Sequence, residues 1–455
     1  MKLRATALLG AALVSIGTCA LVLRDADAQK VDPRRPAVFV VGAPAGAAPM
    51  HRVDARRSGA AKQALPNGTL NVAARKTTGL SVDQPALVGA DGVVAVVTSR
   101  GDVIFLDEKL DELAHVNVGV GAIGPATMTS DGTIVYASTN GDAFGVKRSG
   151  ASARVRFTTR IGGDGTRRGA APLALDDGGV VLVTGSDLVV LDGEGNVRTR
   201  ATLPETPAAP LVAAGDKVLV VTTAGTVFGY TPGREPVRLG SFGAPIDHGA
   251  ALLDGSTLVA VIESNHLVEL DIAHGARSTR SIAPQGFYLG PPAVRTGAKN
   301  TTFATVLALT PNREFVVTLD GAGQETQRAP IATLTPQVLS DGGVAPLIAP
   351  AHVGPIIDSR GTVAFAATDG HVGVVTAEGA VDMIGDTLCR ASGRSAGIAG
   401  LTPHSPGSFL VTCESGTVAR IVGPGAETIR KSSTTTTVKP GPLRTPASAK
   451  PPDDD

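Results

Sequence analysis

One pattern of hydrophobic and polar positions recurs along most of the chain. A turn residue, usually Gly, precedes a short segment in which apolar residues alternate with others, and the segment often ends in Asp or Thr. The eight copies are Gly101–Asp107, Gly141–Lys147, Ser186–Asp192, Gly225–Thr231, Asn265–Asp271, Glu314–Asp320, Gly370–Thr376 and Gly416–Val422. Seven steps separate Gly101 from Gly416, and they average 45 residues. Short segments with a period of two residues predict β-strands, and nothing sustains the 3.6-residue period of a helix.

Each copy is surrounded by further strand signals. In most copies a small residue and Pro precede an apolar pair, as at Ala171-Pro172, and a run rich in β-branched residues such as Val180–Val183 follows. Several of these runs begin at an Asp-Gly dipeptide, which supplies the positive φ that tight hairpin turns need. These dipeptides are Asp91-Gly92, Asp131-Gly132, Asp177-Gly178 and Asp254-Gly255. A more polar segment such as Glu112–Val118 comes after each copy, so every unit is predicted to contain four strands.

A period near 45 residues with four antiparallel strands is typical of a propeller blade. We therefore predict an all-β fold, an eight-bladed β-propeller of four-stranded antiparallel blades. The weak sixth copy, Glu314–Asp320, and the step of 56 residues after it leave seven blades as the alternative. The Pro-rich region Ala329–Pro355 is predicted to be an irregular insertion.

A closed ring needs one strand that joins its two ends. Thr69–Arg75 is a strand-like segment before the first unit, and it is predicted to be the outermost strand of the last blade. Glu427–Lys431 competes for that position. Small residues are expected on the inner strands, which crowd together at the axis.

The first residues have the features of a secretory signal peptide. Lys2 and Arg4 precede an apolar run from Ala5 to Leu23, and a small-x-small site ends at Ala28. Cleavage after Ala28 is the main prediction. A retained membrane anchor is the first alternative because the run is long enough to span a bilayer. Attachment of a lipid at Cys19 is the second.

These signals divide the chain into four parts. We predict a signal peptide at 1–28, a linker at 29–49, the propeller at 50–431 and a disordered Thr/Pro-rich tail at 432–455. The tail carries almost no apolar residue whose burial would offset the entropy lost on ordering. The predicted location is outside the cytoplasm, periplasmic or extracellular.

Composition narrows the possible partners. Lys and Arg together number 41, as do Asp and Glu, so the sequence gives no general attraction to nucleic acid, and none is predicted as a partner. Hydrophobic residues make up 43% of the chain, which permits a real core. A monomer with a protein or cell-envelope partner is predicted, and no transmembrane span is expected after cleavage.

Three cysteines are too few for a disulfide scaffold or a Cys-based zinc array. Cys389 and Cys413 remain after signal cleavage, about half a repeat apart on neighbouring seventh and eighth units. In an oxidising compartment they form a possible disulfide; two buried thiols are the alternative.

Several residues and motifs match known chemistry only in part. His266 and His371 occupy the same position in two repeats, which leaves a metal or acid–base role open beside that of surface histidines. Gly393–Gly397 spells GxSxG and Gly119–Gly124 spells GxGxxG, but neither leads into a predicted helix. The polar stretch Gly162–Arg168 is interpreted as a connector. The acidic turn residues are explained by turn geometry and not by calcium binding.

The stretch Met50–Gly59, MHRVDARRSG, resembles the opening motif of exported proteins with pyrroloquinoline-quinone-like (PQQ-like) repeats. His51 stands where an aromatic residue is usual in that family. Val72–Gly79 is similar to the family's outer strand and Gly turn, and the eight copies are similar to the core of its repeat. The resemblance implies a propeller over roughly Met50–Lys431. The family includes quinone-dependent alcohol dehydrogenases and non-enzymatic BamB-type lipoproteins that assist outer-membrane barrel assembly.

The chain departs from the enzymatic branch of that family. Quinoprotein dehydrogenases carry a Trp in most blades and an adjacent Cys-Cys pair, whereas this chain has no Trp and no adjacent cysteines. A quinone also needs a flat stacking partner and a cation clamp. We therefore predict a non-catalytic scaffold or protein-interaction module with no cofactor, no metal and no catalytic residues. The alternative is an enzyme with its active site in the axial funnel, either a degenerate quinoprotein or a lactonase-like hydrolase.

Overall fold

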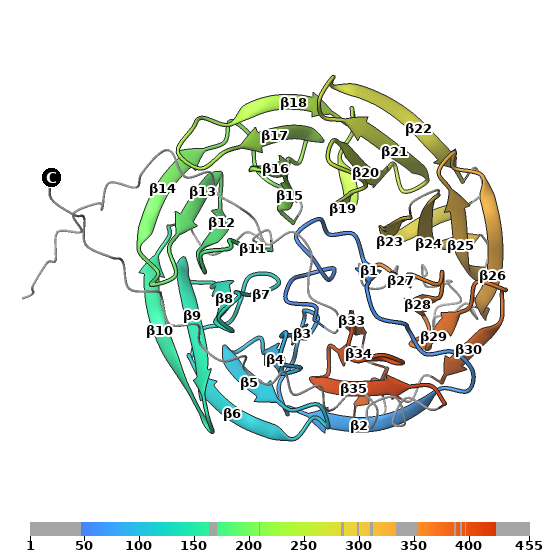
Figure 1. Cartoon of the computed structure of the whole chain (residues 1–455), viewed down its shortest axis with the longest axis horizontal. Helices are drawn as coiled ribbons and strands as arrows, with labels where there is room; N and C mark the ends of the chain where they lie inside the picture. The colour runs from blue at the N-terminus through green and yellow to red at the C-terminus, as the bar shows by residue number, and fades with distance from the viewer. Residues whose placement is uncertain are drawn as a thin grey trace, which may run out of the picture.

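The computed structural model of the chain is a closed ring of eight four-stranded β-sheets (Figure 1). It describes residues 47–162, 171–208, 210–283, 286–297, 300–309, 313–333, 353–385, 388–391, 394–395 and 397–424. No α-helix occurs within these residues. The predicted eight-bladed propeller is confirmed and the seven-bladed alternative is wrong. The signal peptide, Cys19, the Thr/Pro-rich tail and Glu427–Lys431 lie outside the described residues.

Blades one to four follow each other along the chain, and each runs from the axis to the rim. Blade one comprises β3 (Leu87–Val88), β4 (Val94–Val97), β5 (Asp102–Leu106) and β6 (Glu112–Asn117). Blade two comprises β7 (Thr127–Met128), β8 (Ile134–Ala137), β9 (Asp142–Ser149) and β10 (Ser152–Arg160). Blade three comprises β11 (Leu173–Ala174), β12 (Val180–Thr184), β13 (Asp187–Leu191) and β14 (Val197–Thr202). Blade four comprises β15 (Val212–Ala214), β16 (Lys217–Val221), β17 (Thr226–Tyr230) and β18 (Val237–Ser241).

Blades five to eight complete the circle, and the last two also use strands from the start of the chain. Blade five comprises β19 (Ile246–Leu252), β20 (Thr257–Ile262), β21 (His266–Asp271) and β22 (Ala276–Ile282). Blade six comprises β23 (Gly286–Thr296), β24 (Thr301–Leu309), β25 (Arg313–Asp320) and β26 (Glu325–Thr333). Blade seven comprises β27 (Ile356–Asp358), β28 (Val363–Ala366), β29 (Val372–Val375) and β30 (Val381–Ile384), with β1 (Ala60–Ala61) as a fifth strand. Blade eight comprises β33 (Ile398–Pro403), β34 (Ser408–Cys413), β35 (Thr417–Val422) and β2 (Asn71–Thr77).

Burial explains the strand pattern of each blade. The middle strands, such as β12 and β17, are buried along their whole length because neighbouring blades cover both faces of the sheet. The outer strands, such as β14, alternate between half-buried and exposed residues because one face meets water. The sequence signature of the repeat is therefore the third, buried strand of each blade, and the polar segment after it is the outer strand.

The ring is closed by the N-terminal strand. β2 pairs antiparallel with β35, from Asn71 opposite Val422 to Thr77 opposite Thr417. The prediction that the N-terminal segment closes the last blade is thus confirmed. Non-covalent pairing joins the two ends of the ring, so the stability of the whole circle includes these strand bonds.

Two local predictions need correction. Gly92, Gly132 and Gly178 have positive φ as expected, but Gly255 does not. In that turn Asp254 accepts hydrogen bonds from the backbone N–H groups of Ser256 and Thr257 instead. The region expected to be an irregular insertion begins in regular structure, since β26 extends to Thr333; residues 334–352 lie outside the described part of the chain.

Candidate functional site

Residues Ala47–Leu65, here called the axial segment, run through the middle of the ring and contact every blade (Figure 1). Backbone N–H groups of the inner strands donate to carbonyl oxygens of this segment at 2.7–2.9 Å. The donor–acceptor pairs are Met128–Pro49, Ala213–Ala55, Leu252–Arg56, Val294–Ser58, Ile357–Gly59 and, after β33, Gly407–Ala64. Ala48 forms a bridge with Val88 of blade one. The residues at positions 47–49, which we assigned to a linker, therefore belong to the propeller.

Arg57 links the axial segment to blades three and four. Its side chain is 1% exposed. The guanidinium donates to the carbonyl oxygens of Leu211 (2.8 Å), His51 (2.9 Å), Ala171 (3.0 Å) and Pro172 (2.8 Å). Burial lowers its pKa to about 9, so the group remains charged at neutral pH. A buried cation that is bound by four carbonyls has a structural role at the axis.

Arg52 makes a similar contact with blade six. Its Nη2 donates to the carbonyl of Pro292 at 2.6 Å, and its guanidinium lies against the backbone at Gly354. Burial lowers the pKa of Arg52 to about 10. A Cβ atom at position 354 would lie 1.7 Å from Nη1 of Arg52 and 2.4 Å from the carbonyl oxygen of Pro291. Only glycine leaves room for the arginine here.

We expect the substitution Gly354→Ala to destabilise the ring by about 2 kcal/mol, because the backbone oxygen of Pro291 leaves the new methyl group no space. Gly255→Ala is the matched control, since a Cβ at that turn meets no atom within 4 Å. Urea unfolding of both variants measures the difference. Equal urea midpoints for the two variants would show that Arg52 and the backbone near it move aside without a loss of stability.

His51 and Asp54 complete the polar part of the axial segment. Burial, with the nearby charges of Arg57 and Arg52, holds the pKa of His51 well below its usual range, so this imidazole is neutral at pH 7. The carboxylate of Asp54 accepts hydrogen bonds from the backbone N–H (3.1 Å) and hydroxyl (2.9 Å) of Ser58. These contacts fix the turn that presents Arg57.

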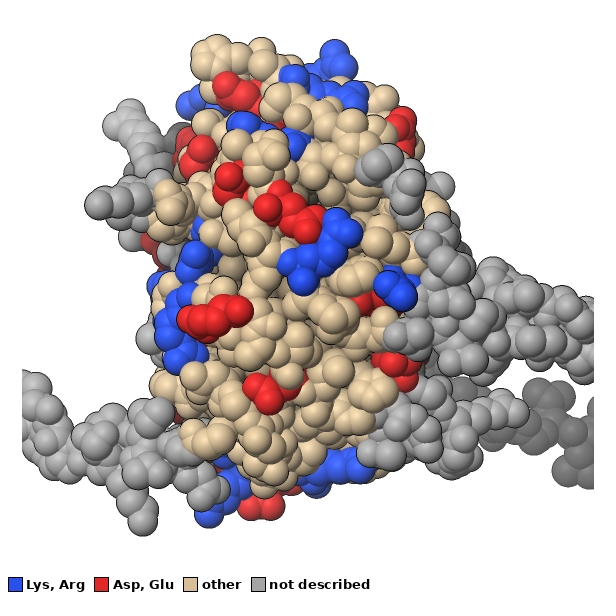
Figure 2. Space-filling model, turned by 90° about the vertical axis from the view of Figure 1, so that its right-hand side faces the viewer, with Lys and Arg blue, Asp and Glu red and all other residues tan. Residues whose placement is uncertain are grey.

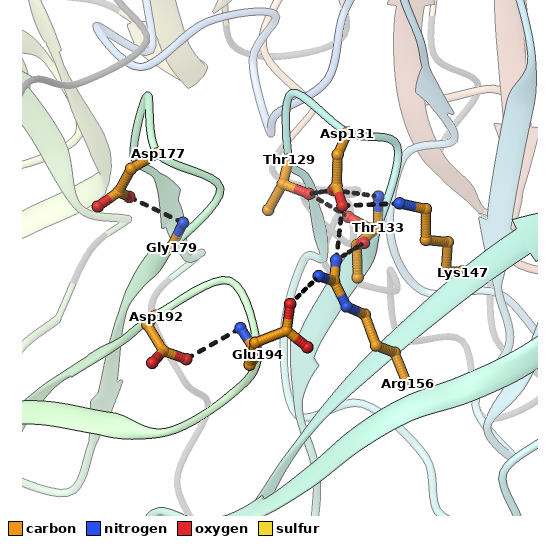
Figure 3. A network of polar contacts seen from close by, with 9 residues as sticks. All are labelled: Thr129, Asp131, Thr133, Lys147, Arg156, Asp177, Gly179, Asp192 and Glu194. Carbon is orange, nitrogen blue, oxygen red and sulfur yellow. Dashed lines mark hydrogen bonds and ion pairs between the residues drawn. The ribbon is translucent and has the colours of Figure 1, made fainter. Parts of the chain in front are cut away.

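A second candidate site is an open cleft of about 440 Å³ between blades two and three. Five carboxylates and two guanidinium groups line it, so its net charge is negative. Arg156 of β10 lies between the blades and binds Asp131 and Glu194 at 2.5 Å each (Figure 3). Arg198 of β14 pairs with Asp177. The lining residues are Ser130, Asp131, Arg156, Asp176, Asp177, Gly178, Asp192, Gly193, Glu194 and Arg198.

Two carboxylates of this cleft, Asp131 and Asp177, remain ionised in mild acid. Burial alone would raise the pKa of Asp131, but hydrogen bonds from Lys147, Thr129 and Thr133 lower it well below its usual range. At Asp177 burial is similarly outweighed by its hydrogen bonds, of which that from Arg198 is the largest, and its pKa is lowered. The cleft therefore offers a stable negative surface that a cationic group can approach.

The residues singled out in the sequence do not converge on one centre. His266 of blade five pairs with Glu263 at 3.4 Å, and His371 of blade seven pairs with Asp369 at 2.9 Å. Within the described chain no group of three or more His, Cys, Asp or Glu side chains is arranged to hold a metal ion. The turn aspartates Asp91, Asp131 and Asp177 accept the backbone N–H two residues ahead, as turn geometry requires.

Both glycine motifs lie among the strands of the ring, and neither leads into a helix. Arg394–Ser395 of the GxSxG stretch is β32, which pairs with β31 (Arg390–Ala391), and strand β33 follows. A nucleophile elbow would instead need a helix after the serine. In the GxGxxG stretch, Gly121 packs against the carbonyl of Ser99, and the chain continues into β7. The stretch 163–170, with most of the polar connector, lies outside the described residues.

The structure joins Cys389 and Cys413 by a disulfide, with Cα atoms 5.3 Å apart. Cys413 ends β34 of blade eight. Cys389 lies in the connection from blade seven to blade eight and not in a blade-seven strand. Both residues are fully buried.

His404, in the first turn of blade eight, is a buried titratable group that the sequence did not distinguish from the other histidines. Its Nδ1 lies 3.3 Å from the hydroxyl oxygens of Ser405 and Ser408, and its Nε2 is buried without a hydrogen-bond partner among the described residues. His404 is 1% exposed and Ser408 is 0% exposed, so a substrate has no access to this pair.

The buried His404 predicts acid sensitivity. Burial, followed by the charge of Arg420, lowers its pKa to about 4. Between about 6.5 and 4 the unfolded chain binds a proton that the folded chain does not, so stability falls as pH falls through this window. We expect a loss of about 2 kcal/mol between about pH 7 and pH 4.5. Urea unfolding across this range should show that the free energy of unfolding depends less on pH for His404→Asn than for the native protein. The same dependence in both proteins would contradict the assignment of this acid sensitivity to His404.

Charged side chains do not gather by sign on the side of the ring that Figure 2 shows, where basic and acidic groups lie scattered among uncharged residues. This distribution agrees with the balanced composition. In the described residues, no helix has the length and apolar character needed to cross a membrane.

Comparison with known proteins establishes the fold. No protein-family model and no curated protein matches the sequence. Among solved structures, BamB from Moraxella catarrhalis superposes with a TM-score of 0.53 at 16% identity, over 78% of this chain and 98% of that one. Quinohemoprotein alcohol dehydrogenase ADHIIG from Pseudomonas putida HK5 gives 0.57 at 11% identity, over 90% and 83%. The quinohemoprotein alcohol dehydrogenase from Comamonas testosteroni gives 0.55 at 10% identity, over 93% and 84%. The resemblance to these propellers is confirmed at the level of fold.

The axial residues of this chain do not suit a quinone cofactor. Arg57, a cation of the kind that would hold a quinone carboxylate, donates to four main-chain carbonyls. The chain has no Trp to stack on a flat ring. Arg57 is therefore not available as a clamp for such a cofactor, and no Trp can supply its stacking surface.

Proposed function

We propose that this protein is an exported, non-catalytic propeller that binds a protein partner of the cell envelope, in the manner of a BamB-like scaffold. One observation carries the proposal: the axial segment crosses the middle of the ring and bonds to the inner strands there, in the place where a propeller enzyme would hold its substrate. The same segment holds its buried cation Arg57 in four hydrogen bonds to carbonyls, which leaves that group committed to structure.

The cleft between blades two and three is the proposed contact surface. It is open, negatively charged and supported by ion pairs that fix its walls. Such a surface suits a partner segment that presents Lys or Arg side chains, because opposite charges favour encounter and register. Export is supported by the N-terminal sequence and by the buried disulfide, which persists in an oxidising compartment.

Site-specific photo-crosslinking in cells tests this proposal. A photoreactive residue at Asp176, on the wall of the cleft, should give a crosslink to one discrete protein. The control is the same residue at Asp216, an exposed position in the corresponding turn of blade four. Crosslinks of equal yield at both positions, or none at Asp176, would reject the cleft as the contact surface. A purified protein that turns over an added lactone would favour the enzymatic alternative.

A further inference from the structure

The inner strands of the ring hold the axial segment through main-chain hydrogen bonds, as a binding site holds a peptide. Donors on blades two, four, five, six, seven and eight bond to residues 49, 55, 56, 58, 59 and 64 in turn, so position along the segment follows position around the ring. Five of these six donors lie in inner strands, and all six acceptors are main-chain carbonyls of the segment. Main-chain hydrogen bonds to the edges of sheets are one way in which proteins bind peptides.

Side chains of the segment add specificity to this pairing. Arg57 anchors it to blades three and four, and Arg52 anchors it to blade six. Met50 packs into the apolar cluster formed by the same two blades that Arg57 joins. Gly59 stands where a Cβ would lie 2.5 Å from Arg52. A peptide that binds at the axis therefore needs arginines at the positions of Arg52 and Arg57 and a glycine at the position of Gly59.

The conformation of the segment depends on the ring. Arg52, Val53 and Arg57 have φ of 56°, 78° and 56°, in the left-handed region that L-residues rarely adopt. Each such residue stays there only when its surroundings hold it. In turn, the ring donors would face the axis without these acceptors if the segment left. Segment and ring thus complete each other's hydrogen bonding.

We propose that the axis is a peptide-binding channel whose resident ligand is the axial segment, and that the channel will accept the same segment from a second copy of the chain. The axial segment can be separated from the rest of the chain at its connection to β2, because Asn67, Gly68 and Thr69 are exposed. Cutting the chain there leaves the contacts of the segment intact. The inference does not depend on the partner proposed above.

The test uses the full chain with a protease site inserted after Gly68. After cleavage of the folded protein, the segment should co-elute with the ring in gel filtration. The cut protein is then unfolded and refolded with equal amounts of two labelled peptides spanning residues 47–66, one of native sequence and one with Arg57→Ala. The recovered ring should carry the native peptide in at least about tenfold excess.

A peptide with Lys62→Ala is the matched control, because Lys62 is an exposed cation of the same segment, and it should be incorporated as well as the native peptide. Release of the segment on cleavage, with or without unfolding of the ring, would overturn the proposal. So would equal incorporation of the Arg57→Ala peptide, or recovery of a folded ring that carries neither a labelled peptide nor its own cleaved segment.

Discussion

Replacing Arg57 by Met should lower the free energy of unfolding by about 4 kcal/mol. The side chain is fully buried, and its removal leaves the carbonyls of Leu211, His51, Ala171 and Pro172 without their donor. Each buried acceptor that loses a charged partner bears a desolvation cost. Chemical denaturation followed by circular dichroism measures the change.

Two variants sharpen this experiment. Lys62→Met removes an exposed cation from the same segment and should change stability by less than about 0.5 kcal/mol. Arg57→Lys keeps the charge but not the planar fork, so it should recover only a small part of the loss. A stability of Arg57→Met equal to that of Lys62→Met would mean that the axial contacts do not hold the blades together.

Removal of the disulfide should produce the second large loss of stability. Cys389 and Cys413 are separated by 24 positions, and opening a loop of this size should lower the free energy of unfolding by about 3 kcal/mol. The double substitution Cys389→Ser and Cys413→Ser avoids a single unpaired thiol. Thermal unfolding of the purified protein provides the measurement.

A reductant supplies the internal control for this prediction. Dithiothreitol should lower the melting temperature of the native protein and leave that of the double Ser variant unchanged. A native protein that melts at the same temperature in reductant, with two thiols titrated after unfolding without reductant, would show that the bond does not form. The ring would then rely on β2 and the axial segment alone.

Eight blades of four strands and the N-terminal strand that closes the ring were predicted from the sequence, with seven blades and closure by Glu427–Lys431 left open as alternatives. Each depends on local information: alternation such as that of Gly225–Thr231, turn residues such as Gly132, and a strand-like segment at Asn71–Thr77. Short apolar segments between turn residues identify strands from local sequence alone, whatever the distant chain does. The exception, Asp254-Gly255, shows that a turn dipeptide allows more than one backbone solution.

Both candidate sites were decided by the tertiary structure. Arg57 meets Ala171 and Leu211, which are 114 and 154 positions away, and no pattern near residue 57 records those distances. The Met50–Gly59 motif could be noticed in the sequence, but its path through the axis could not. The cleft likewise combines turns from two blades with side chains of their outer strands. Repetition in the chain specifies one blade at a time, whereas an axis and a cleft exist only where several blades meet, and that geometry is set by how the sheets pack.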